Sequence, residues 1–261
     1  MGTKDIGYGS LLMLLILVVP IMAINWKMKL KINKSLTYSI VRMLIQLSLV
    51  GIYLQYIFTL NNSFLNIAYL IVMIVVASVS TINSSKLKLK KFFFPIFFSI
   101  LIPQVIILLY FNCFIVRLDN VFDAKYMIPI GGMILGNCLS GNIVGLNSFY
   151  YNIKNNENQY IYSITLGATK VQALIPYFRE AILGAINPTI ASMATIGLVS
   201  LPGMMTGQIL GGSVPLVAIK YQIAIMLAIF IAKYFSTMLS IIFSVKKSFN
   251  DFNMLQKNVF L

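Results

Sequence analysis

The chain has 261 residues, of which 59% are hydrophobic and 10% charged, and its mean hydropathy is +0.88. Soluble domains are only about 45–50% apolar, so this composition excludes a soluble enzyme and predicts a single all-α polytopic transmembrane domain over residues 1–261. Histidine is absent from the sequence, which excludes serine–histidine catalysis, thiol–histidine catalysis and histidine-ligated metal.

Seven apolar runs are long enough to cross a bilayer, whose hydrocarbon core needs about 20 residues of helix. They cover residues 6–24, 38–60, 64–82, 92–111, 126–146, 186–210 and 216–245. The first run is interpreted as a retained span because no small-residue cleavage site follows it; a cleaved leader is the alternative. We therefore expect a helical bundle of about seven spans.

The basic residues fall mainly in alternate connections between these runs. One side of the membrane holds 14 of them, namely Lys27, Lys29, Lys31, Lys34, Lys86, Lys88, Lys90, Lys91, Lys154, Lys170, Arg179, Lys246, Lys247 and Lys257. The other side holds 3, namely Lys4, Arg117 and Lys125. By the positive-inside rule the N-terminus faces out and the C-terminus faces the cytoplasm. The net charge of +14 thus reflects topology in the plasma membrane and attraction to anionic lipid, and nucleic-acid binding is not expected.

Few side chains in the spans could carry chemistry. All six acidic residues lie in loops or flanks, which leaves the spans without a carboxylate dyad or carboxylate proton relay. Cys113 and Cys138 show no CxxC spacing and are expected to be small buried hydrophobes. A GxxxxGKS/T phosphate loop is also absent, so ATP and Mg²⁺ would have to bind another chain. We expect no cofactor, metal site or catalytic residue in this one.

The longest connection covers residues 147–185, on the predicted cytoplasmic side. Its first part, NSFYYNIKNNENQ, is polar, and its second part, YIYSITLGATKVQALIPYFREAI, has apolar residues at helical intervals interrupted by Gly167 and Pro176. This pattern predicts a helix, a turn at the glycine and a second, amphipathic helix. A loop of this kind is too organised for a linker and too small for a domain, which indicates a docking surface.

The sixth run contains the segment ATIGLVSLPGMMTGQILGG, residues 194–212. Pro202 lacks a backbone N–H and clashes with the preceding turn, so it predicts a kink or break in the helix. Unwound backbone at membrane depth is tolerated only where protein buries it or where it lines a watery cavity. We interpret the break as a hinge and as part of a translocation path, formed by Ser200, Pro202, Gly203, Met204, Met205, Thr206, Gly207 and Gln208.

This segment also has simpler interpretations. Gly203, Gly207 and Gly211 recur every four residues, which is equally typical of ordinary close packing between helices. Met204 and Met205 are soft thioethers that suit Cu(I), but methionine more often serves as flexible packing. Metal ligation is therefore the less favoured role for these two residues.

Polar residues in three other spans have two possible roles each. Arg42 and Gln46 share one face of the second span, where Arg42 either extends to the interface or contacts the path. Asn137 lies in the fifth span, whose GxxxG spacings favour a close crossing, which we expect to be with the sixth span. Lys233 lies 13 residues before Lys246, about 20 Å of helix, so either the last span is tilted or Lys233 faces a cavity.

Residues 166–226, LGATKVQALIPYFREAILGAINPTIASMATIGLVSLPGMMTGQILGGSVPLVAIKYQIAIM, closely resemble the FetB-type ABC transporter permeases, a family of bacterial iron-export permeases with plant relatives in aluminium tolerance. The segments VRMLIQLSLVGIYLQYIF, residues 41–58, and GGMILGNCLSG, residues 131–141, resemble the second and fifth spans of this family. The resemblance covers nearly the whole membrane region, and GLVSLPGMMTGQI is its most specific block.

The resemblance implies a permease subunit that works as a homodimer with a separate FetA-type ATPase. It also implies that a glycine-centred coupling helix inserts into the ATPase; the matching residues are Leu166, Gly167, Ala168, Thr169, Gln172 and Ala173, with Arg179 in the same loop. Many such loops carry an acidic residue several positions before the glycine, whereas this chain has Ile161 and Tyr162 there, with Glu157 further upstream.

The activity implied by the resemblance is export of a metal ion, with iron as the first candidate, by alternating access. Two alternatives belong to other classes of protein. A stand-alone secondary transporter or channel would need ion-coupling groups in the membrane, and the spans contain no Asp, Glu or His. A non-transporting membrane scaffold would have no specific ATPase partner.

Overall fold

The computed structural model describes residues 6–250, 252–256 and 259, and these form an all-helical fold without a β-strand. Lys4 and Lys257 of the charge pattern lie outside the described residues. In chain order the helices are α1 (Tyr8–Ile16), α2 (Val19–Lys27), α3 (Asn33–Leu60), α4 (Ser63–Ser84), α5 (Leu89–Tyr110), the π-helix η1 (Phe111–Val116), α6 (Ala124–Asn155), α7 (Glu157–Thr165), α8 (Lys170–Thr195), α9 (Gly203–Leu210) and α10 (Pro215–Ser248).

Six stretches of the described chain are long and apolar enough to cross a membrane. They are Gly9–Lys27, Asn33–Leu60, Ser63–Ser84, Leu89–Val116, Ala124–Asn155 and Pro215–Ser248, and they match six of the seven predicted runs. The remaining run, residues 186–210, is not one helix, because α8 ends at Thr195 and α9 begins at Gly203. The all-helical fold with several spans is therefore confirmed, and the break expected near Pro202 divides the sixth run.

The connection predicted at residues 147–185 is mostly helical. α6 continues to Asn155 through the part expected to be a polar loop, because Phe149, Tyr150 and Ile153 recur on one buried face. The helix–turn–helix pattern is confirmed, since α7 ends before Gly167 and α8 begins after it. Pro176 lies inside α8 without ending it, as membrane helices permit when neighbouring groups compensate for the lost hydrogen bond.

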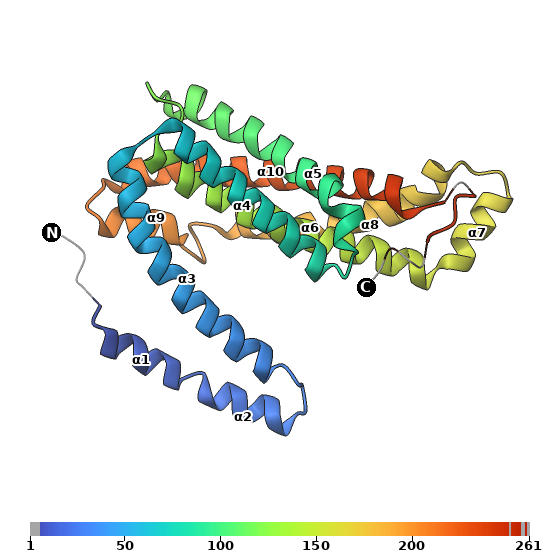
Figure 1. The fold of residues 1–261 in the computed structure, drawn as a ribbon, viewed down its shortest axis with the longest axis horizontal. Coiled ribbons are helices and arrows are strands. Elements are labelled where there is room, and N and C mark those ends of the chain that lie inside the picture. Colours follow the sequence, from blue (N-terminus) through green and yellow to red (C-terminus); the bar gives the residue numbers. More distant parts are fainter. Residues whose placement is uncertain (1–5, 251, 257–258, 260–261) are drawn as a thin grey trace.

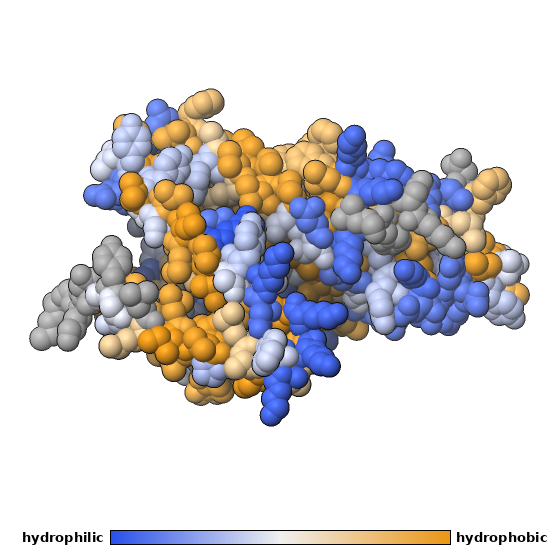
Figure 2. All heavy atoms as spheres, turned by 60° about the horizontal axis from the view of Figure 1, so that its bottom comes forward, coloured by the Kyte–Doolittle hydropathy of each residue, from blue (hydrophilic) through white to orange (hydrophobic). Residues whose placement is uncertain are grey.

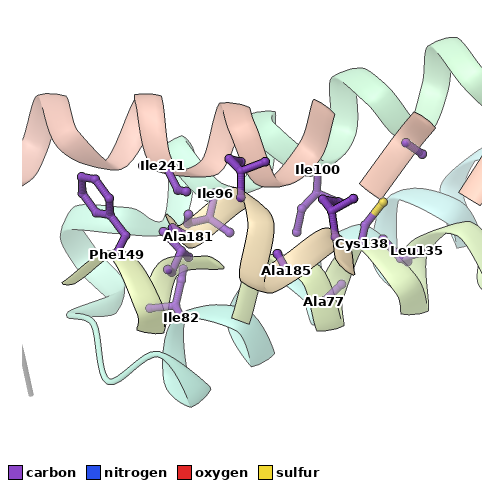
Figure 3. Packing of buried hydrophobic residues seen from close by; sticks show 14 of the residues in the cluster. Ala77, Ile82, Ile96, Ile100, Leu135, Cys138, Phe149, Ala181, Ala185 and Ile241 are labelled. Carbon is purple, nitrogen blue, oxygen red and sulfur yellow. The ribbon is translucent and has the colours of Figure 1, made fainter. Parts of the chain in front are cut away.

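A bundle of α4, α5, α6, α8 and α10 forms the body of the molecule (Figure 1). Isoleucine and alanine side chains fill the space between these helices (Figure 3); among the fully buried ones are Ile82, Ile96, Ile100, Ala181 and Ile241. The small side chains of α8 let this helix approach α6 closely, because alanine at an interface shortens the distance between two backbones.

α10 presents a stripe of small polar side chains and one lysine to this core. The buried members recur every three or four residues and are Lys233, Ser236, Thr237, Ser240, Ser244 and Ser248. Ser240 shares a hydrogen bond with Ser99 of α5, with 2.8 Å between the two Oγ atoms, and Ser248 is hydrogen-bonded to Tyr150 of α6. In lipid no hydrophobic force draws helices together, so close packing and polar contacts must do so. The stripe therefore positions α5 and α6 on α10.

α6 makes its close glycine crossing with α10, which corrects the expectation that the sixth predicted span would be the partner. A Cβ built on Gly141 would lie 2.7 Å from Cγ of Lys233, and one built on Gly145 would lie 2.5 Å from Cγ2 of Thr237. Ala185, which directly precedes the sixth predicted span, lies further away, at 3.8 Å from the Gly145 position. Gly141 and Gly145 thus leave the room that the α10 side chains occupy.

α1, α2 and α3 extend away from the bundle (Figure 1). Of the residues in α3 only Ile57 is buried, and it packs with Ala124 and Ile128 of α6. The loop before α4 supports this contact, because Asn61 Oδ1 accepts a hydrogen bond from the backbone N–H of Ala124 at 2.9 Å. Most of the apolar surface of the three N-terminal helices is thus left for lipid or for another chain.

We expect Gly141→Val to lower the free energy of unfolding by about 1–3 kcal/mol, the usual cost of overpacking a filled core. Three side-chain atoms of Lys233 and Thr237 lie within 3 Å of the new Cβ position. The matched control is Gly136→Val, because no heavy atom lies within 4 Å of a Cβ built there. Thermal unfolding of the detergent-solubilised variants measures the difference, and equal losses would contradict the crossing.

Candidate functional site

The turn between α7 and α8 is a short, conformationally fixed projection. Gly167 has φ 92°, in the left-handed region that favours glycine, and a Cβ built on it would meet no atom within 4 Å. Thr169 caps α8: its Oγ1 accepts a hydrogen bond from Gln172 N at 3.3 Å, and Gln172 Oε1 accepts one from Thr169 N at 2.9 Å. This reciprocal capping box satisfies two free backbone donors at the helix start, so nearby residues set the backbone conformation of the turn.

Apolar side chains project from both sides of this turn. Leu166 is 70% exposed at the end of α7, and Val171 is 69% exposed in the first turn of α8. The other residues expected to couple are distributed as follows: Gly167, Thr169, Gln172 and Arg179 are exposed, Ala168 is half-buried and Ala173 is buried. A rigid turn with exposed apolar flanks is suited to enter a cleft on another protein.

The segment that follows α10 supports the turn from inside the molecule. The hydroxyl of Tyr160 in α7 donates to Asn253 O at 2.7 Å, and its ring lies 5.8 Å from that of Phe249. Lys170 Nζ lies 4.4 Å from the centre of the Phe249 ring, a favourable cation–π position. Burial lowers the pKa of Lys170 and raises the pKa of Tyr160. This contact could not be predicted from the sequence, since no local pattern links α7 to residues some 90 positions later.

The same segment also reaches the start of α5. Lys88 N donates to Val259 O at 3.0 Å, and Lys91 Nζ donates to Gln256 Oε1 at 3.2 Å. The α7–α8 turn, the segment after α10 and the first residues of α5 are therefore connected to one another at one end of the bundle.

The break in the sixth predicted span is a short turn of its own. Gly197 has φ 84° and donates its backbone N–H to Ser200 O at 2.9 Å, and Ile196 pairs with Ser200 in an isolated bridge. Pro202 is the N-cap residue of α9, a place where its missing N–H costs nothing. Leu198, at the tip of the turn, is 91% exposed. The unwound backbone predicted from Pro202 is thus present over residues 196–202.

α9, which carries most of the predicted path residues, packs against α10. Met205 is buried; Pro202, Met204, Thr206 and Gln208 are half-buried; Ser200, Gly203 and Gly207 are exposed. Thr206 Oγ1 donates to Pro202 O at 3.1 Å, and Gln208 Oε1 is buried without a partner. No atom lies within 4 Å of a Cβ built on Gly203 or Gly207, so the close helix contact that their spacing suggested is not formed within the described chain.

A buried polar cluster lies between α6, α8 and α10. Lys233 is 6% exposed, and its Nζ donates to Thr189 Oγ1 at 2.8 Å. Beside it, Asn142 Nδ2 donates to Ser236 Oγ at 2.9 Å, and the Cys138 thiol contacts the same serine. No other charged side chain is buried among the residues that the structure describes. An intramembrane charge enclosed by polar groups is the usual mark of a functional position.

The structure shows whether Lys233 faces a cavity, which was one of the two alternatives that the sequence left open. The residue lies 18 positions after Pro215, the first residue of α10, which is about 27 Å along the helix. Its stem fills the space left by Gly141 and its Nζ reaches across to α8. Lys233 is thus enclosed by three helices and does not face an open cavity, whereas a tilt of the last span stays a prediction.

The remaining predicted path residues lie apart from these groups. Arg42 and Gln46 are exposed on α3, and Asn137 is half-buried with its Nδ2 donating to Met133 O of its own helix at 2.9 Å.

Of the two cysteines expected to be buried, Cys138 is buried, but Cys113 is exposed on η1 and that expectation was wrong. The members of the polar cluster missing from the expected path are Cys138, Asn142, Thr189, Lys233 and Ser236. The regular spacing of polar residues on the last span was a signal that could have indicated some of them.

The helices described above define an integral membrane protein that crosses the bilayer several times. The chain belongs to the uncharacterised protein family UPF0014, whose profile matches residues 8–249.

Relatives in this family confirm the resemblance inferred from residues 166–226. The chain is 32% identical over 255 residues to the Escherichia coli (strain K12) protein named probable iron export permease protein FetB, covering 98% of this chain and 97% of the relative. It is 34% identical over 215 residues to protein ALUMINUM SENSITIVE 3 of Arabidopsis thaliana, covering 81% and 76% of the two chains. It is 29% identical over 221 residues to UPF0014 membrane protein YjkA of Bacillus subtilis (strain 168), covering 84% and 86%. No solved structure matches the chain.

We expect Lys233→Met to leave thermal stability unchanged or higher, because an apolar side chain of similar length replaces a buried charge. Lys233→Ala should instead lower the free energy of unfolding by about 2–5 kcal/mol, the cost of a cavity left by a long buried side chain. The measurement is thermal unfolding in detergent, with Lys246→Ala at the exposed end of α10 as the matched control. Equal stability of Lys233→Ala and wild type would contradict the enclosed position of Lys233.

Proposed function

We propose that this chain is the membrane-spanning permease subunit of an ABC transporter, which exports a metal ion and is driven by ATP hydrolysis on a separate ATPase chain. The observation that carries the proposal is the α7–α8 turn, with Gly167 in a left-handed conformation, Thr169 capping α8 and apolar side chains exposed on both flanks. In the proposed complex, Leu166 and Val171 enter a cleft on the ATPase. ATP and Mg²⁺ bind that partner, since the sequence has no phosphate loop.

α8 supplies a direct mechanical connection from this turn to the membrane core. The helix runs unbroken from Lys170 to Thr195, and Thr189 lies 19 residues along it, about 29 Å from its start. At that point Thr189 accepts the hydrogen bond from Lys233. A displacement of the turn is therefore transmitted along one continuous helix, which bends at most at Pro176 and Pro188, to the polar cluster where α8, α6 and α10 meet.

The break at residues 196–202 follows directly after this helix. Hinges are a few positions that absorb backbone rotation between packed elements, and Gly197 and Pro202 satisfy this description, one with positive φ and the other ending the unwound segment. We propose that rocking of α8 is taken up here, which opens the path on alternate sides. The polar groups Thr206 and Gln208 then line the path beside α10.

The proposed topology has seven crossings, with α8 and α9 together making the sixth, an outside N-terminus and a cytoplasmic C-terminus. Figure 1 supports it, because α7 and the end of α10 lie at one end of the bundle, while α9 lies at the other. The proposed assembly is a homodimer, for which the exposed surface of α1 to α3 supplies apolar area. Arg42 and Gln46 on α3 would then reach the path only across that interface.

Iron is the first candidate for the exported substrate, from the name of the Escherichia coli relative. No group of three or more His, Cys, Asp or Glu side chains in the described part of the chain could hold a metal ion. The proposal therefore includes no resident metal: the ion passes as substrate, and the side chains that meet it are neutral oxygen and thioether donors.

The coupling turn is tested by Leu166→Arg, which places a charge on the exposed flank without straining Gly167. We expect the co-purified ATPase to fall about tenfold or more, as expected when a central interface residue is lost. The measurement is affinity purification of the tagged chain from its own membranes, followed by quantification of bound ATPase and of ATP hydrolysis.

The matched control is Leu216→Arg, which makes the same replacement at an equally exposed leucine at the start of α10. This variant should retain the ATPase. If wild type brings down no ATPase, the ABC assignment fails; if both variants lose it equally, the α7–α8 turn is not the docking element.

The hinge is tested by Gly197→Ala, since a side chain in the left-handed region costs about 1–2 kcal/mol and should impede rotation at the break. We expect several-fold lower ATP hydrolysis by the reconstituted complex with an unchanged amount of bound ATPase. Gly136→Ala in α6 is the matched control, because Gly136 does not have positive φ, has open space around it and lies outside the break. Unaltered hydrolysis in Gly197→Ala would remove the hinge from the mechanism.

A further inference from the structure

A basic pocket of about 630 Å³ lies at the turn between α2 and α3. Four lysines, two asparagines and a tryptophan line it, and none of these described residues is acidic. Lys29 and Lys31 both have φ 55°, so the chain turns tightly and brings lysines from the end of α2, the turn and the start of α3 around one space. The lysines are Lys27, Lys29, Lys31 and Lys34. Their uncompensated positive charge points to an anionic ligand.

Unpaired polar atoms at the pocket indicate where a ligand would be held. The Asn25 side chain is only 6% exposed and its Nδ2 has no hydrogen-bond partner. Asn33 Nδ2 donates a hydrogen bond to Met22 O at 2.8 Å, and the buried Oδ1 of Asn33 has no partner. Buried amide groups without partners are rare in native structures because each is costly. The pocket thus offers one deep donor and one deep acceptor beside the lysines.

The place of the pocket along the chain sets its depth in the membrane. One candidate span ends at Lys27 and the next begins at Asn33, so both flanking helices enter the hydrocarbon from the pocket. Trp26 is 82% exposed, and tryptophan favours the level of the lipid headgroups. In Figure 2, hydrophilic residues border the strongly hydrophobic surface of the N-terminal helices. This is the depth at which a phospholipid carries its phosphate.

We propose that this pocket binds the phosphodiester headgroup of an anionic phospholipid. The phosphate oxygens accept hydrogen bonds from the lysines and from Asn25 Nδ2, and a headgroup hydroxyl, such as those of phosphatidylglycerol, donates to Asn33 Oδ1. The acyl chains lie along the exposed apolar surface of α2 and α3. The inference stands on this turn alone and does not depend on the proposed transport function.

Trp26 makes the proposal measurable, because it is the only tryptophan in the sequence. The full chain is reconstituted in vesicles of phosphatidylcholine with brominated acyl chains, which quench a nearby tryptophan. Unbrominated phosphatidylglycerol is then added, and its power to restore Trp26 fluorescence is compared with that of unbrominated phosphatidylcholine. We expect phosphatidylglycerol to be several-fold more effective, because it displaces the quenching lipid from the pocket.

Two variants test the pocket itself. Asn25→Leu removes the unpaired donor and retains a side chain branched at Cγ, so the chain should fold and the preference for phosphatidylglycerol should fall. Lys29→Gln with Lys31→Gln should lower the preference at least about fivefold, the effect of one lysine near an anionic surface. The matched control is Lys86→Gln with Lys88→Gln in the α4–α5 turn, which removes the same charge away from Trp26 and should leave the preference unchanged. Circular dichroism confirms that each variant is folded.

Three results would overturn the proposal. One is equal restoration by the two lipids in wild type. The second is an equal loss of preference in the control pair, which would show general attraction to a charged surface. The third comes from inorganic phosphate added to the phosphatidylcholine vesicles: if it saturably changes Trp26 fluorescence in wild type but not in Asn25→Leu, and phosphatidylglycerol has no effect, the pocket takes a soluble anion.

Discussion

The close contact between α6 and α10 is the constraint on which the rest of the bundle depends. Gly141 and Gly145 leave room for Lys233 and Thr237, and the buried polar face of α10 then meets α5 through Ser99. The hydrophobic effect does not drive the association of helices in lipid, so the contact between α6 and α10 is stabilised by close packing and by hydrogen bonds. Because α10 touches α5, α6, α8 and α9, the position of one helix determines the position of four.

The same arrangement places a strong donor at the junction of three helices. Lys233 has a single hydroxyl partner, Thr189, on the helix that leads to the α7–α8 turn. A buried amine held by one hydrogen bond is sensitive to small shifts of its partner, because the alternative is an unpaired polar group in a medium of low dielectric constant. The cluster is thus well placed to favour discrete positions of α8 over a continuous range.

The features that could be predicted from the sequence are those set by the thickness of the bilayer or by the backbone chemistry of single residues. Apolar length identified six of the spans, and Pro202 and Gly167 marked the break and the turn because their backbone chemistry is local. The extension of α6 was missed, since Phe149, Tyr150 and Ile153 are spaced among polar residues. Contacts between distant parts of the chain, such as Gly141 with Lys233 or Tyr160 with Asn253, could not be predicted. The residues of one segment alone do not show which other segment it contacts. The coupling, hinge and path roles of the predicted residues stay predictions.

The contacts between α7 and the segment that follows α10 have a consequence for biosynthesis. Chains are made from the N-terminus, so Phe249 and Asn253 emerge only after every membrane helix has been translated. Until then Tyr160 lacks its hydrogen-bond acceptor and Lys170 lacks the aromatic ring beneath it. The turn between α7 and α8 therefore acquires its final support late, and an incomplete chain presents this surface in a less ordered form than the finished protein does.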